Sequence, residues 1–363
     1  MAEASASPFI SISVRVMDFA ATPRSLGYSM PAEWERHEAT WISWPHIDGQ
    51  SFPESYHRVV PTLVKMASVL AESEILRINI SNSEQQSEVR GLLSAVAPME
   101  RIEFHSNPTN EPWCRDHGPI FVKRASAPQL AVNDFGYNAW GNKYPPFDAD
   151  DIVPTRIARH FGFPLFEPPF ILEGGSVDPN GAGALLTTES CLLNPNRNPS
   201  MSRDQIEQGL RDYLGVEQII WLGDGIEGDD TDGHVDDITR FVSRDTVITV
   251  VEPNQADPNH LPLKENLERL RGMKLYDGTP LKVIEMPMPP RIDREGIRLP
   301  ASHANFYIAN ESVLMPSFGG DSDVESVEIL AELFPTRMIR PIDCRELIWG
   351  LGAFHCLTQQ QPA

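Results

Sequence analysis

Apolar and polar residues follow two rhythms in the first third of the chain, one helical and one extended. Between residues 54 and 73 the apolar positions fall three or four residues apart, which predicts a helix with Pro61 in its first turn. Residues 75–81 alternate apolar with polar side chains, which predicts a strand, and Ser83 begins another helix. Strands and helices therefore interleave from this region onward.

The same patterns continue through the rest of the chain. A serine cap at Ser202, apolar positions at helical spacing and a stop at Gly215 predict a helix over residues 202–214. Asp321 is predicted to cap a further helix that ends at Leu333. Because elements of both kinds interleave, we expect one α/β body. Strands are predicted at residues 218–222 and 246–251, and a hairpin at residues 305–308 and 313–315 around Asn310.

Length and charge narrow the class of protein. The 363 residues suit two domains, or one large barrel or propeller. Acidic residues outnumber basic ones 51 to 30, and the formal charge of −21 disfavours nucleic acid as a partner. No run approaches the roughly 18 consecutive apolar residues that a membrane helix needs, so no membrane partner is expected.

Cysteine usage and the first residues bear on location. The four cysteines show no CxxC spacing, so neither a disulfide framework nor a zinc motif is indicated, and we expect a reducing, cytoplasmic setting. Residues 1–27 lack the basic start of a signal peptide, and Arg15 and Asp18 interrupt the apolar segment. We interpret residues 1–27 as a loose N-terminal arm. The cysteines are Cys114, Cys191, Cys344 and Cys356.

Residues 347–361 carry candidate chemistry. An apolar run leads through Gly350 and Gly352 to Cys356, and glycines allow a backbone to turn tightly or to approach a ligand closely. Such a turn could present the thiol at the edge of a cleft. The alternative is a small buried thiol in a final strand, because free cysteine is among the most buried residue types.

Residues 223–237 form the most acidic stretch, with seven carboxylates, no Lys or Arg and one imidazole, that of His234. Like charges this close repel, so a metal, a basic segment elsewhere or a cationic substrate must offset them. A calcium loop fails, because its best alignment puts Gly228 and Thr239 at positions that require ligands. A transition-metal site would use His234 and Asp236 on one face of a strand, yet no further ligand clusters accompany them.

Two other segments combine charge with a turn. Residues 113–119 place Arg115 and Asp116 beside a tryptophan, and the simpler interpretation is a surface ion pair next to a core ring. Glu173 ends an apolar run and precedes two glycines, which would also fit a plain turn. A carboxylate that enters a buried region usually needs a partner, however.

One thiol, one imidazole and three carboxylates from separate segments are the parts for nucleophilic attack on a cationic carbon. A guanidinium suits them, since carboxylates can grip its N–H groups in pairs and orient the central carbon. The thiolate would attack that carbon, and the imidazole would protonate the departing ammonia and then activate water. Because carboxylates raise a thiol pKa, we expect Cys356 to be protonated in the empty site and to ionise when a guanidinium or His234 supplies positive charge.

Together these segments resemble the agmatine deiminase and bacterial peptidylarginine deiminase family, within the guanidino-group modifying enzymes. The resemblance spans nearly everything after residue 28. The matching motifs are residues 30–35 (Met-Pro-Ala-Glu-Trp-Glu), 41–45, 113–119, 173–175, 233–236, 305–310 and 355–362.

The resemblance implies a five-bladed pseudo-symmetric α/β propeller of ββαβ modules, with residues 28–363 as a single catalytic domain. The segments that contain candidate catalytic residues recur about sixty residues apart, which agrees with repeated modules around one site. No metal or organic cofactor is implied, and assembly into a homo-oligomer stays open. By the family's pattern the site comprises the nucleophile Cys356, the general acid/base His234, the guanidinium-binding Asp116, Asp236 and Glu173, and the substrate-contacting Trp113.

The implied reaction converts agmatine to N-carbamoylputrescine and ammonia through a covalent thiouronium on Cys356, a step of polyamine biosynthesis. The alternatives are a peptidylarginine or other small-guanidine deiminase, and a non-catalytic guanidine-binding protein of the same fold. Cys114, beside Arg115, is the competing nucleophile.

Three features depart from the family's pattern and are expected near the tail of the substrate. Asp237 stands where Asn is common, residues 46–50 replace a charged and aromatic run, and His303 replaces a Tyr. Asp48 and Glu111 are the acidic candidates for the amine end.

Overall fold

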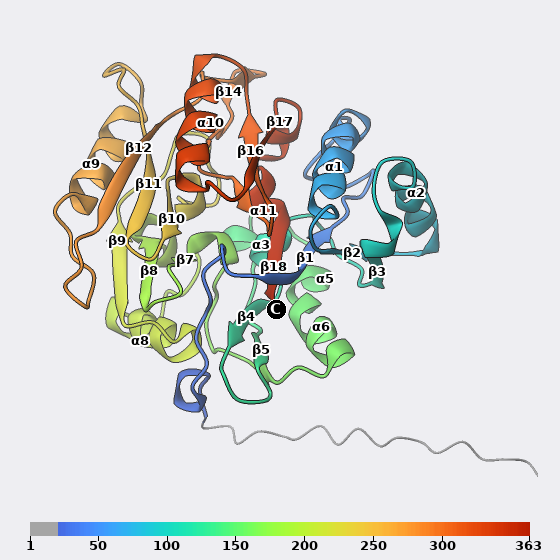
Figure 1. Ribbon diagram of the computed structural model, residues 1–363, viewed down its shortest axis with the longest axis horizontal. Coiled ribbons are helices and arrows are strands. Elements are labelled where there is room, and N and C mark those ends of the chain that lie inside the picture. The colour runs from blue at the N-terminus through green and yellow to red at the C-terminus, as the bar shows by residue number, and fades with distance from the viewer. Residues whose placement is uncertain (1–20) are drawn as a thin grey trace, which may run out of the picture.

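The computed structural model describes residues 21–363, and its fold is mixed α/β. Strands lie toward the middle, and the longer helices lie around the outside (Figure 1). The helices are α1 Tyr56–Leu70, α2 Ser83–Leu93, α3 Cys114–His117, α4 Ala139–Asn142, α5 Asp148–Asp151, α6 Val153–Phe161, α7 Glu189–Leu192, α8 Arg203–Leu214, α9 His260–Leu270, α10 Asp321–Leu333 and α11 Phe354–Leu357. Short 3₁₀ helices are η1 Arg24–Leu26, η2 Met99–Arg101, η3 Gly174–Ser176, η4 Val235–Asp237 and η5 Leu347–Gly350.

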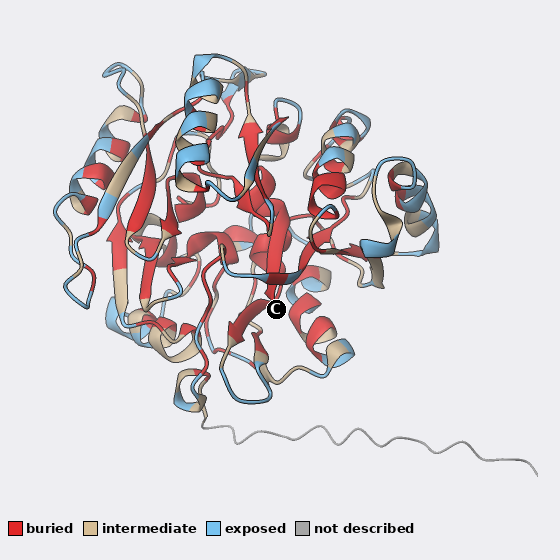
Figure 2. Ribbon diagram, in the orientation of Figure 1, coloured by how far each residue is buried: buried red, intermediate tan, exposed pale blue. Residues whose placement is uncertain are grey.

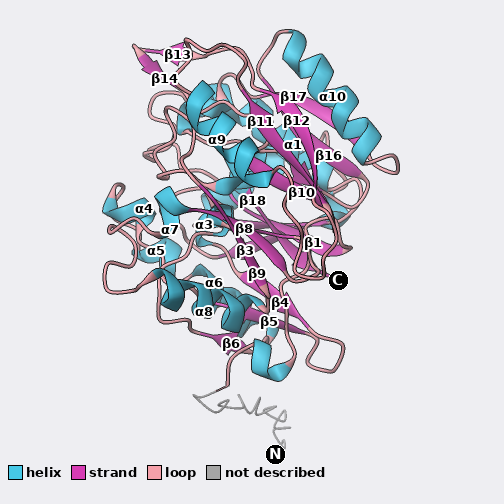
Figure 3. Cartoon of the chain, turned by 90° about the vertical axis from the view of Figure 1, so that its left-hand side faces the viewer, coloured by secondary structure: helices cyan, strands magenta, loops and turns pink. Residues whose placement is uncertain are grey.

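Within residues 21–363 the strands form five separate sheets of three or four strands and one pair, β13–β14. Figure 3 shows that pair at one end of the molecule. The strands are β1 His37–Ser43, β2 Ile75–Ile80, β3 Ile102–Ser106, β4 Ile120–Lys123, β5 Leu130–Asn133, β6 Leu165–Phe166, β7 Asp178–Pro179, β8 Ala184–Thr188, β9 Gln218–Leu222, β10 Thr239–Ser243, β11 Thr246–Val251, β12 Lys282–Pro287, β13 Asp293–Arg294, β14 Ile297–Arg298, β15 Tyr307–Ile308, β16 Ser312–Ser317, β17 Met338–Asp343 and β18 Thr358–Pro362.

Four of these sheets share one order of elements. In β4-β5-β6, β7-β8-β9, β10-β11-β12 and β15-β16-β17 the first two strands are antiparallel, and the third is parallel to the second. A helix (α6, α8, α9 or α10) connects the parallel strands, as a parallel crossover requires. Figure 2 shows that the strands are mostly buried and that the exposed residues gather on the outer sides of the helices.

The fifth sheet joins the two ends of the described chain. Its order is β18-β1-β2-β3, with β18 antiparallel to β1 and β1 parallel to β2. In the register Trp41 lies opposite Gln359 and Ile42 opposite Thr358. The side chain of Trp41 also donates to the Gln361 amide oxygen at 3.0 Å. The last strand is therefore held from both its backbone and its side chains.

Local signals predicted some helix ends well. Helix α8 begins after Ser202, whose side chain accepts from the Gln205 backbone in a reciprocal capping box, and it ends at Gly215 with φ 67°. These predictions are confirmed. The predicted position of Pro61 is wrong, because α1 begins at Tyr56 and Pro61 lies inside the helix, past its first turn.

The predicted cap of α10 is also wrong. Gly320 is the residue before the helix, and Asp321 is its first helical residue. Asp323 takes the local hydrogen-bonding role instead, since its carboxylate accepts from the Phe318 and Gly319 backbone N–H groups at 3.1 and 2.8 Å. The hairpin around Asn310 is present, with Ile308 opposite Val313.

Residues 1–20 of the predicted N-terminal arm lie outside the described residues. In residues 21–27, Arg24 pairs with Glu217 at 2.7 Å, and Arg124 donates to the Leu26 carbonyl at 2.9 Å. None of the helices in the described part of the chain is both long and apolar enough to cross a membrane.

Candidate active site

Cys356 lies in the single turn of α11, immediately before β18. The prediction of a final strand is therefore wrong for this residue, while the predicted tight approach is observed. A Cβ added to Gly352 would lie 2.6 Å from the Trp113 ring and 3.0 Å from the Cys356 Cβ. One added to Gly350 would lie 2.4 Å from Phe52. These glycines let the segment pack directly against aromatic rings.

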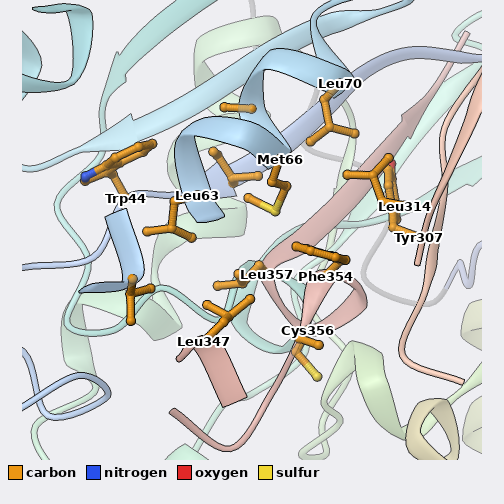
Figure 4. Packing of buried hydrophobic residues seen from close by; sticks show 14 of the residues in the cluster. Trp44, Leu63, Met66, Leu70, Tyr307, Leu314, Leu347, Phe354, Cys356 and Leu357 are labelled. Atoms are coloured by element: carbon orange, nitrogen blue, oxygen red, sulfur yellow. The ribbon is translucent and has the colours of Figure 1, made fainter. Parts of the chain in front are cut away.

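The thiol is buried but faces away from the hydrophobic core. Cys356 is 4% exposed and belongs to the edge of a core cluster. In Figure 4 its sulfur points away from Phe354 and Leu357, which pack into that cluster. A pocket of about 250 Å³ reaches the thiol. Its lining comprises Gln50, Ser51, Pro53, Glu111, Trp113, Asp116, Trp140, Tyr144, Asp230, Thr231, Ile297, Leu299, Trp349, Gly350, Leu351, Gly352 and Cys356.

The structure brings the predicted polar residues together around this thiol. The Asp236 Oδ2 atom lies 3.7 Å from the Cys356 sulfur, and Asp116 Oδ1 lies 3.7 Å from His234 Nδ1. Glu173 has a carboxylate oxygen within 4.8 Å of a ring nitrogen of His234. Each of these side chains is buried. Of the predicted substrate contacts, Trp113 and Asp116 also line the pocket.

Gly175 is the spacer at the centre of this group. Its backbone N–H donates to Asp116 Oδ1 at 3.0 Å. An added Cβ would lie 2.6 Å from His234 Nδ1, 2.9 Å from Asp116 Oδ1 and 3.0 Å from Asp236 Oδ2. The two glycines after Glu173 therefore do more than form a plain turn, because only a residue without a side chain lets these groups approach.

Several polar atoms of the site are buried without a hydrogen-bond partner. Among the described residues they include both ring nitrogens of His234, Glu173 Oε2 and Asp236 Oδ1. Buried polar groups in folded proteins are normally satisfied. Two open carboxylate oxygens beside an unpaired imidazole therefore indicate a ligand that brings several N–H donors and positive charge.

The pKa values of Cys356 and Asp116 indicate a site that favours binding of a cation. Burial raises the pKa of Cys356 well above its usual value of 9.0, and Asp236, Asp237 and Asp116 raise it further against a hydrogen bond from Asn305. Burial raises the pKa of Asp116 to about 6, because the Asp236 and Glu173 charges reinforce it against His234.

The pKa values of His234 and Asp236 are shifted in the direction opposite to the one that burial alone would cause. Burial alone would lower the pKa of His234, but Asp116, Cys191 and Asp236 raise it well above 6.5. Burial alone would raise the pKa of Asp236, but the hydrogen bond and charge of His355, with His234, lower it below 3.8. The imidazole of His234 is thus kept as a proton donor among carboxylates.

Sequence reasoning missed Asn305 and Arg197 as site residues. Asn305 Nδ2 lies 3.0 Å from the Cys356 sulfur and donates to Asp237 at 2.9 Å. Arg197 donates to Glu173 at 2.6 Å, and both side chains are fully buried. Removing Arg197 would leave the Glu173 charge buried and unpaired, which costs about 3–5 kcal/mol.

A positional signal could have found Asn305. Asp116, Glu173, Asp236, Asn305 and Cys356 each lie shortly before the first strand of a different sheet: β4, β7, β10, β15 and β18. The sixty-residue spacing in the sequence reflects this order. Arg197 has no such regular position, so the sequence offered no signal for it.

Basic segments elsewhere offset part of the acidic stretch. Asp232 pairs with Arg197 and with Lys143, the latter at 2.9 Å, and Glu227 pairs with Arg298 at 3.0 Å. Residues 235–237 form η4, so the strand that would have placed His234 and Asp236 on one face is not present.

Two groups within residues 21–363 have potential metal ligands within 4.8 Å of one another. Each already carries protein donors: Arg197 on Glu173, His355 on Asp236 and Asn305 on Cys356 and Asp237. A donor-rich organic cation fits such half-occupied acceptors better than a metal, which would need them all. The groups are Glu173, Cys191 and His234, and Asp236, Asp237 and Cys356.

The expected tail residues fare unevenly. Gln50 lines the pocket, but Asp237, whose carboxylate accepts from Asn305 at 2.9 Å, does not line it. His303 does not line the pocket, because it is buried against α10, where its Nε2 contacts Asp323 at 2.9 Å. Placing His303 near the tail was therefore wrong.

The acidic candidates for the amine end fare unevenly too. Glu111 lines the pocket, yet its carboxylate already accepts from the Gln50 and Ser51 backbone N–H groups at 2.9 and 3.0 Å. Asp48 does not line the pocket, whereas Asp230, which sequence reasoning missed, does.

Cys114 is a poor competitor to Cys356. Its side chain is completely buried, it does not line the pocket, and burial raises its pKa to about 12.

The mixed α/β fold and a buried thiol among acids and an imidazole define an enzyme that modifies guanidino groups. Residues 29–362 match the profile of the Porphyromonas-type peptidyl-arginine deiminase family, and the chain belongs to this family. A Legionella pneumophila protein provisionally named an agmatine deiminase is 35% identical over 347 residues, covering 95% of this chain and 98% of its own. A Mycoplasma capricolum protein with the same provisional name is 33% identical, covering 94% and 98%.

Solved structures give the same result. The agmatine deiminase of Enterococcus faecalis superimposes with a TM-score of 0.87 at 31% identity, covering 94% of this chain and 98% of its own. A cysteine-to-serine variant of the C. jejuni agmatine deiminase, solved with substrate bound, has a TM-score of 0.83 at 30% identity, covering 92% and 96%.

Proposed function

We propose that this protein is an agmatine deiminase, which hydrolyses agmatine to N-carbamoylputrescine and ammonia. The observation that carries the proposal is the set of buried, unpartnered atoms on Glu173, His234 and Asp236 beside the thiol. A guanidinium supplies the N–H donors and the positive charge that the Glu173 and Asp236 oxygens lack. The solved structures of agmatine deiminases with similar sequences support the same assignment.

In this mechanism the carboxylates orient the guanidinium and the thiol attacks it. Asp116, Asp236 and Glu173 hold the N–H groups, so that the central carbon faces Cys356. The bound cation lowers the thiol pKa, and the thiolate forms a C–S bond to that carbon.

His234 then moves protons in both halves of the reaction. It gives a proton to the departing nitrogen, the C–N bond breaks, and ammonia leaves a thiouronium on Cys356. The neutral imidazole next takes a proton from water, whose oxygen attacks the same carbon. The C–S bond breaks as the hydroxyl proton of the tetrahedral intermediate passes to the released ammonia, which gives the ureido product, ammonium and the thiolate.

The mechanism predicts that ligand changes the ionisation of Cys356. Burial and three carboxylates raise its pKa well above 9.0 in the empty site, so its thiolate absorbance should appear only at strongly alkaline pH. A non-reactive guanidine should move the titration to lower pH, because a cation beside the sulfur favours the thiolate. Ultraviolet difference titration with and without such a ligand measures this. Coincident curves would contradict it, and a Cys356→Ala variant supplies the baseline.

We propose that Asp230 recognises the amine end of agmatine. Asp230 lines the same pocket as Cys356, and its Oδ2 atom accepts from the Tyr144 hydroxyl. Burial raises its pKa, and the nearby Asp229 charge adds to this, so an ammonium is a favourable partner. Trp113 and Trp349 supply apolar walls between the two ends. The negative charge of Asp230 would repel the α-carboxylate of free arginine.

Asp230→Asn is expected to raise KM for agmatine by about 10- to 100-fold with kcat little changed, because the negative charge that pairs with the ammonium is lost. For butylguanidine, which has no amine, the variant and the wild-type enzyme should have the same KM. Asp224→Asn removes the same charge from an exposed position of the stretch and should leave both constants unchanged.

The substrate class is tested by ammonia release from agmatine, free arginine and an arginine-containing peptide. Agmatine should be much the best substrate. Preferential release from the peptide would favour the peptidylarginine alternative, and binding without release from any of them would favour a guanidine-binding protein.

We also propose that the five sheets are blades of a pseudo-symmetric α/β propeller with the site on its axis. The shared strand, strand, helix, strand order of four sheets supports this, as does the position of one site segment before each sheet. The four free, buried cysteines fit a cytoplasmic location.

A further inference from the structure

A second histidine lies directly behind the substrate-facing carboxylates. We propose that His355 and Glu33 are positioning residues, which hold Asp236 in its rotamer and keep it negatively charged so that its free oxygen can grip the guanidinium. The inference rests on the proposed function. It gives a role to polar residues of two sequence motifs, residues 30–35 and 355–362. In the mechanism above, Cys356 is the only residue of these motifs that takes part.

The contacts form a continuous buried chain from the site into the core. His355 Nδ1 lies 2.6 Å from Asp236 Oδ2, and His355 Nε2 lies 2.9 Å from Glu33 Oε2. All three residues are at most 3% exposed. Ionised carboxylates only accept hydrogen bonds, so satisfying both contacts requires protons on both ring nitrogens. The ring is then an imidazolium between two carboxylates.

The Glu33 carboxylate is surrounded by several hydrogen-bond donors and cations. Arg115 and the Ile308 backbone N–H donate to its oxygens at 3.1 and 2.8 Å, in addition to His355, and the Arg240 guanidinium forms an ion pair with it at 3.0 Å. Although burial would raise the pKa of Glu33, Arg240, His355 and Arg115 together lower it well below its usual 4.5. Glu33 therefore stays anionic and cannot easily turn away from the histidine.

The charged groups around His355 balance one another. Asp236 faces it from η4 and Glu33 from the segment before β1, while Arg115 on α3 donates through Nε to the His355 carbonyl at 3.2 Å. Arg240 on β10 lies on Glu33 and also pairs with Asp178 at 2.8 Å. Three carboxylates and three cations thus form a closed set, which is how buried charges are tolerated.

The two Asp236 oxygens therefore have different roles in the site. Oδ2 is occupied by His355, whereas Oδ1 is buried with no partner among the described residues. Without the His355 donor, both oxygens would compete for the ligand, and Asp236 would lose the nearest cation that lowers its pKa. Both the binding of a guanidinium and the orientation of its carbon would suffer.

Two substitutions separate the contacts of His355. The amide nitrogen of His355→Asn can occupy the place of Nδ1 and still donate to Asp236, while that of His355→Gln reaches the place of Nε2 and contacts only Glu33. We expect His355→Asn to keep kcat/KM for agmatine within about 10-fold and His355→Gln to lose about 100-fold or more, since the latter loses a hydrogen bond to a charged group.

His303→Asn is the matched control. His303 is another buried histidine with one nitrogen on a carboxylate, Asp323 at 2.9 Å, and the other on the Pro287 carbonyl, and it lies outside the pocket. Its variant should lower Tm, as the His355 variants do, but it should keep wild-type kcat/KM. Equal losses for both His355 variants, or an equal loss for His303→Asn, would overturn the proposal.

Two measurements keep the proposal testable whatever the variants do. In the Cys356→Ala background, calorimetry should show agmatine binding that His355→Gln weakens by about 10-fold or more and His355→Asn does not. No binding to Cys356→Ala itself would instead contradict the proposed function. In wild-type enzyme labelled with ¹⁵N-histidine, NMR at the assay pH should show His355 with protons on both ring nitrogens, and a singly protonated ring would overturn the proposal even if no His355 variant folds.

Discussion

Replacing Cys356 with alanine should lower kcat for agmatine by at least about 10⁴-fold, because Cys356 is the only cysteine among the described residues that line the pocket. Binding should persist, since Asp116, Glu173 and Asp236 keep their positions. Ammonia release measures the first effect, and calorimetry measures the second. The alanine variant should also give no mass adduct with a guanidine that traps the wild-type thiol.

Cys344→Ala is the matched control for that experiment. Cys344 is a free and fully buried cysteine that does not line the pocket, so its removal changes packing but not chemistry. It should keep near wild-type kcat. Cys114→Ala tests the competing nucleophile in the same way, and inactivation by selective alkylation of Cys114 would refute the assignment to Cys356.

Gly175→Ala should lower kcat/KM by about 10³-fold or more without unfolding the protein. Its new methyl carbon would lie under 3.0 Å from His234 Nδ1 and Asp116 Oδ1, and 3.0 Å from Asp236 Oδ2. These groups would have to separate, and a displacement near 1 Å in a catalytic site costs about 10²-fold by itself. Steady-state kinetics measure the effect, with circular dichroism to confirm the fold.

Gly91→Ala makes the same chemical change where there is room. Gly91 lies within α2, and an added Cβ would have no neighbour within 4 Å. This variant should be fully active and slightly more stable, because alanine favours a helix over glycine by about 1 kcal/mol. A fully active Gly175→Ala would show that the site tolerates a wider spacing than its geometry implies.

Elements with strong local signals could be predicted from the sequence. Ser202 and Gly215 bound α8 because a cap and a left-handed stop act within a few residues. The start of α10 could not be predicted in this way: Asp321 was the predicted cap, but Gly320 precedes the helix and Asp321 is its first helical residue. Only the turn that precedes the helix shows that Asp323 reaches its backbone N–H groups.

The site divides in the same manner. Asp116, His234 and Cys356 could be named because each stands in a short motif and because a thiol, an imidazole and acids form a recognisable set. The supporting partners could not, since pairs such as Arg197 with Glu173, or Asn305 with Cys356, are set by how separate sheets face one another. His303 was misplaced for the same reason: its neighbours in sequence lie near the site, but its ring turns toward α10.

The pairing of β18 with β1 has a kinetic consequence. It links residues such as Trp41 and Gln361, 320 positions apart, so it is among the most non-local contacts of the fold and should form late. Until it forms, β1 is an unprotected sheet edge with a largely buried composition, which invites pairing with another chain. Since Cys356 lies in α11, the turn that leads into β18, refolding followed by recovered activity should lag behind refolding followed by helix content, and the intervening species should be the one most prone to aggregate.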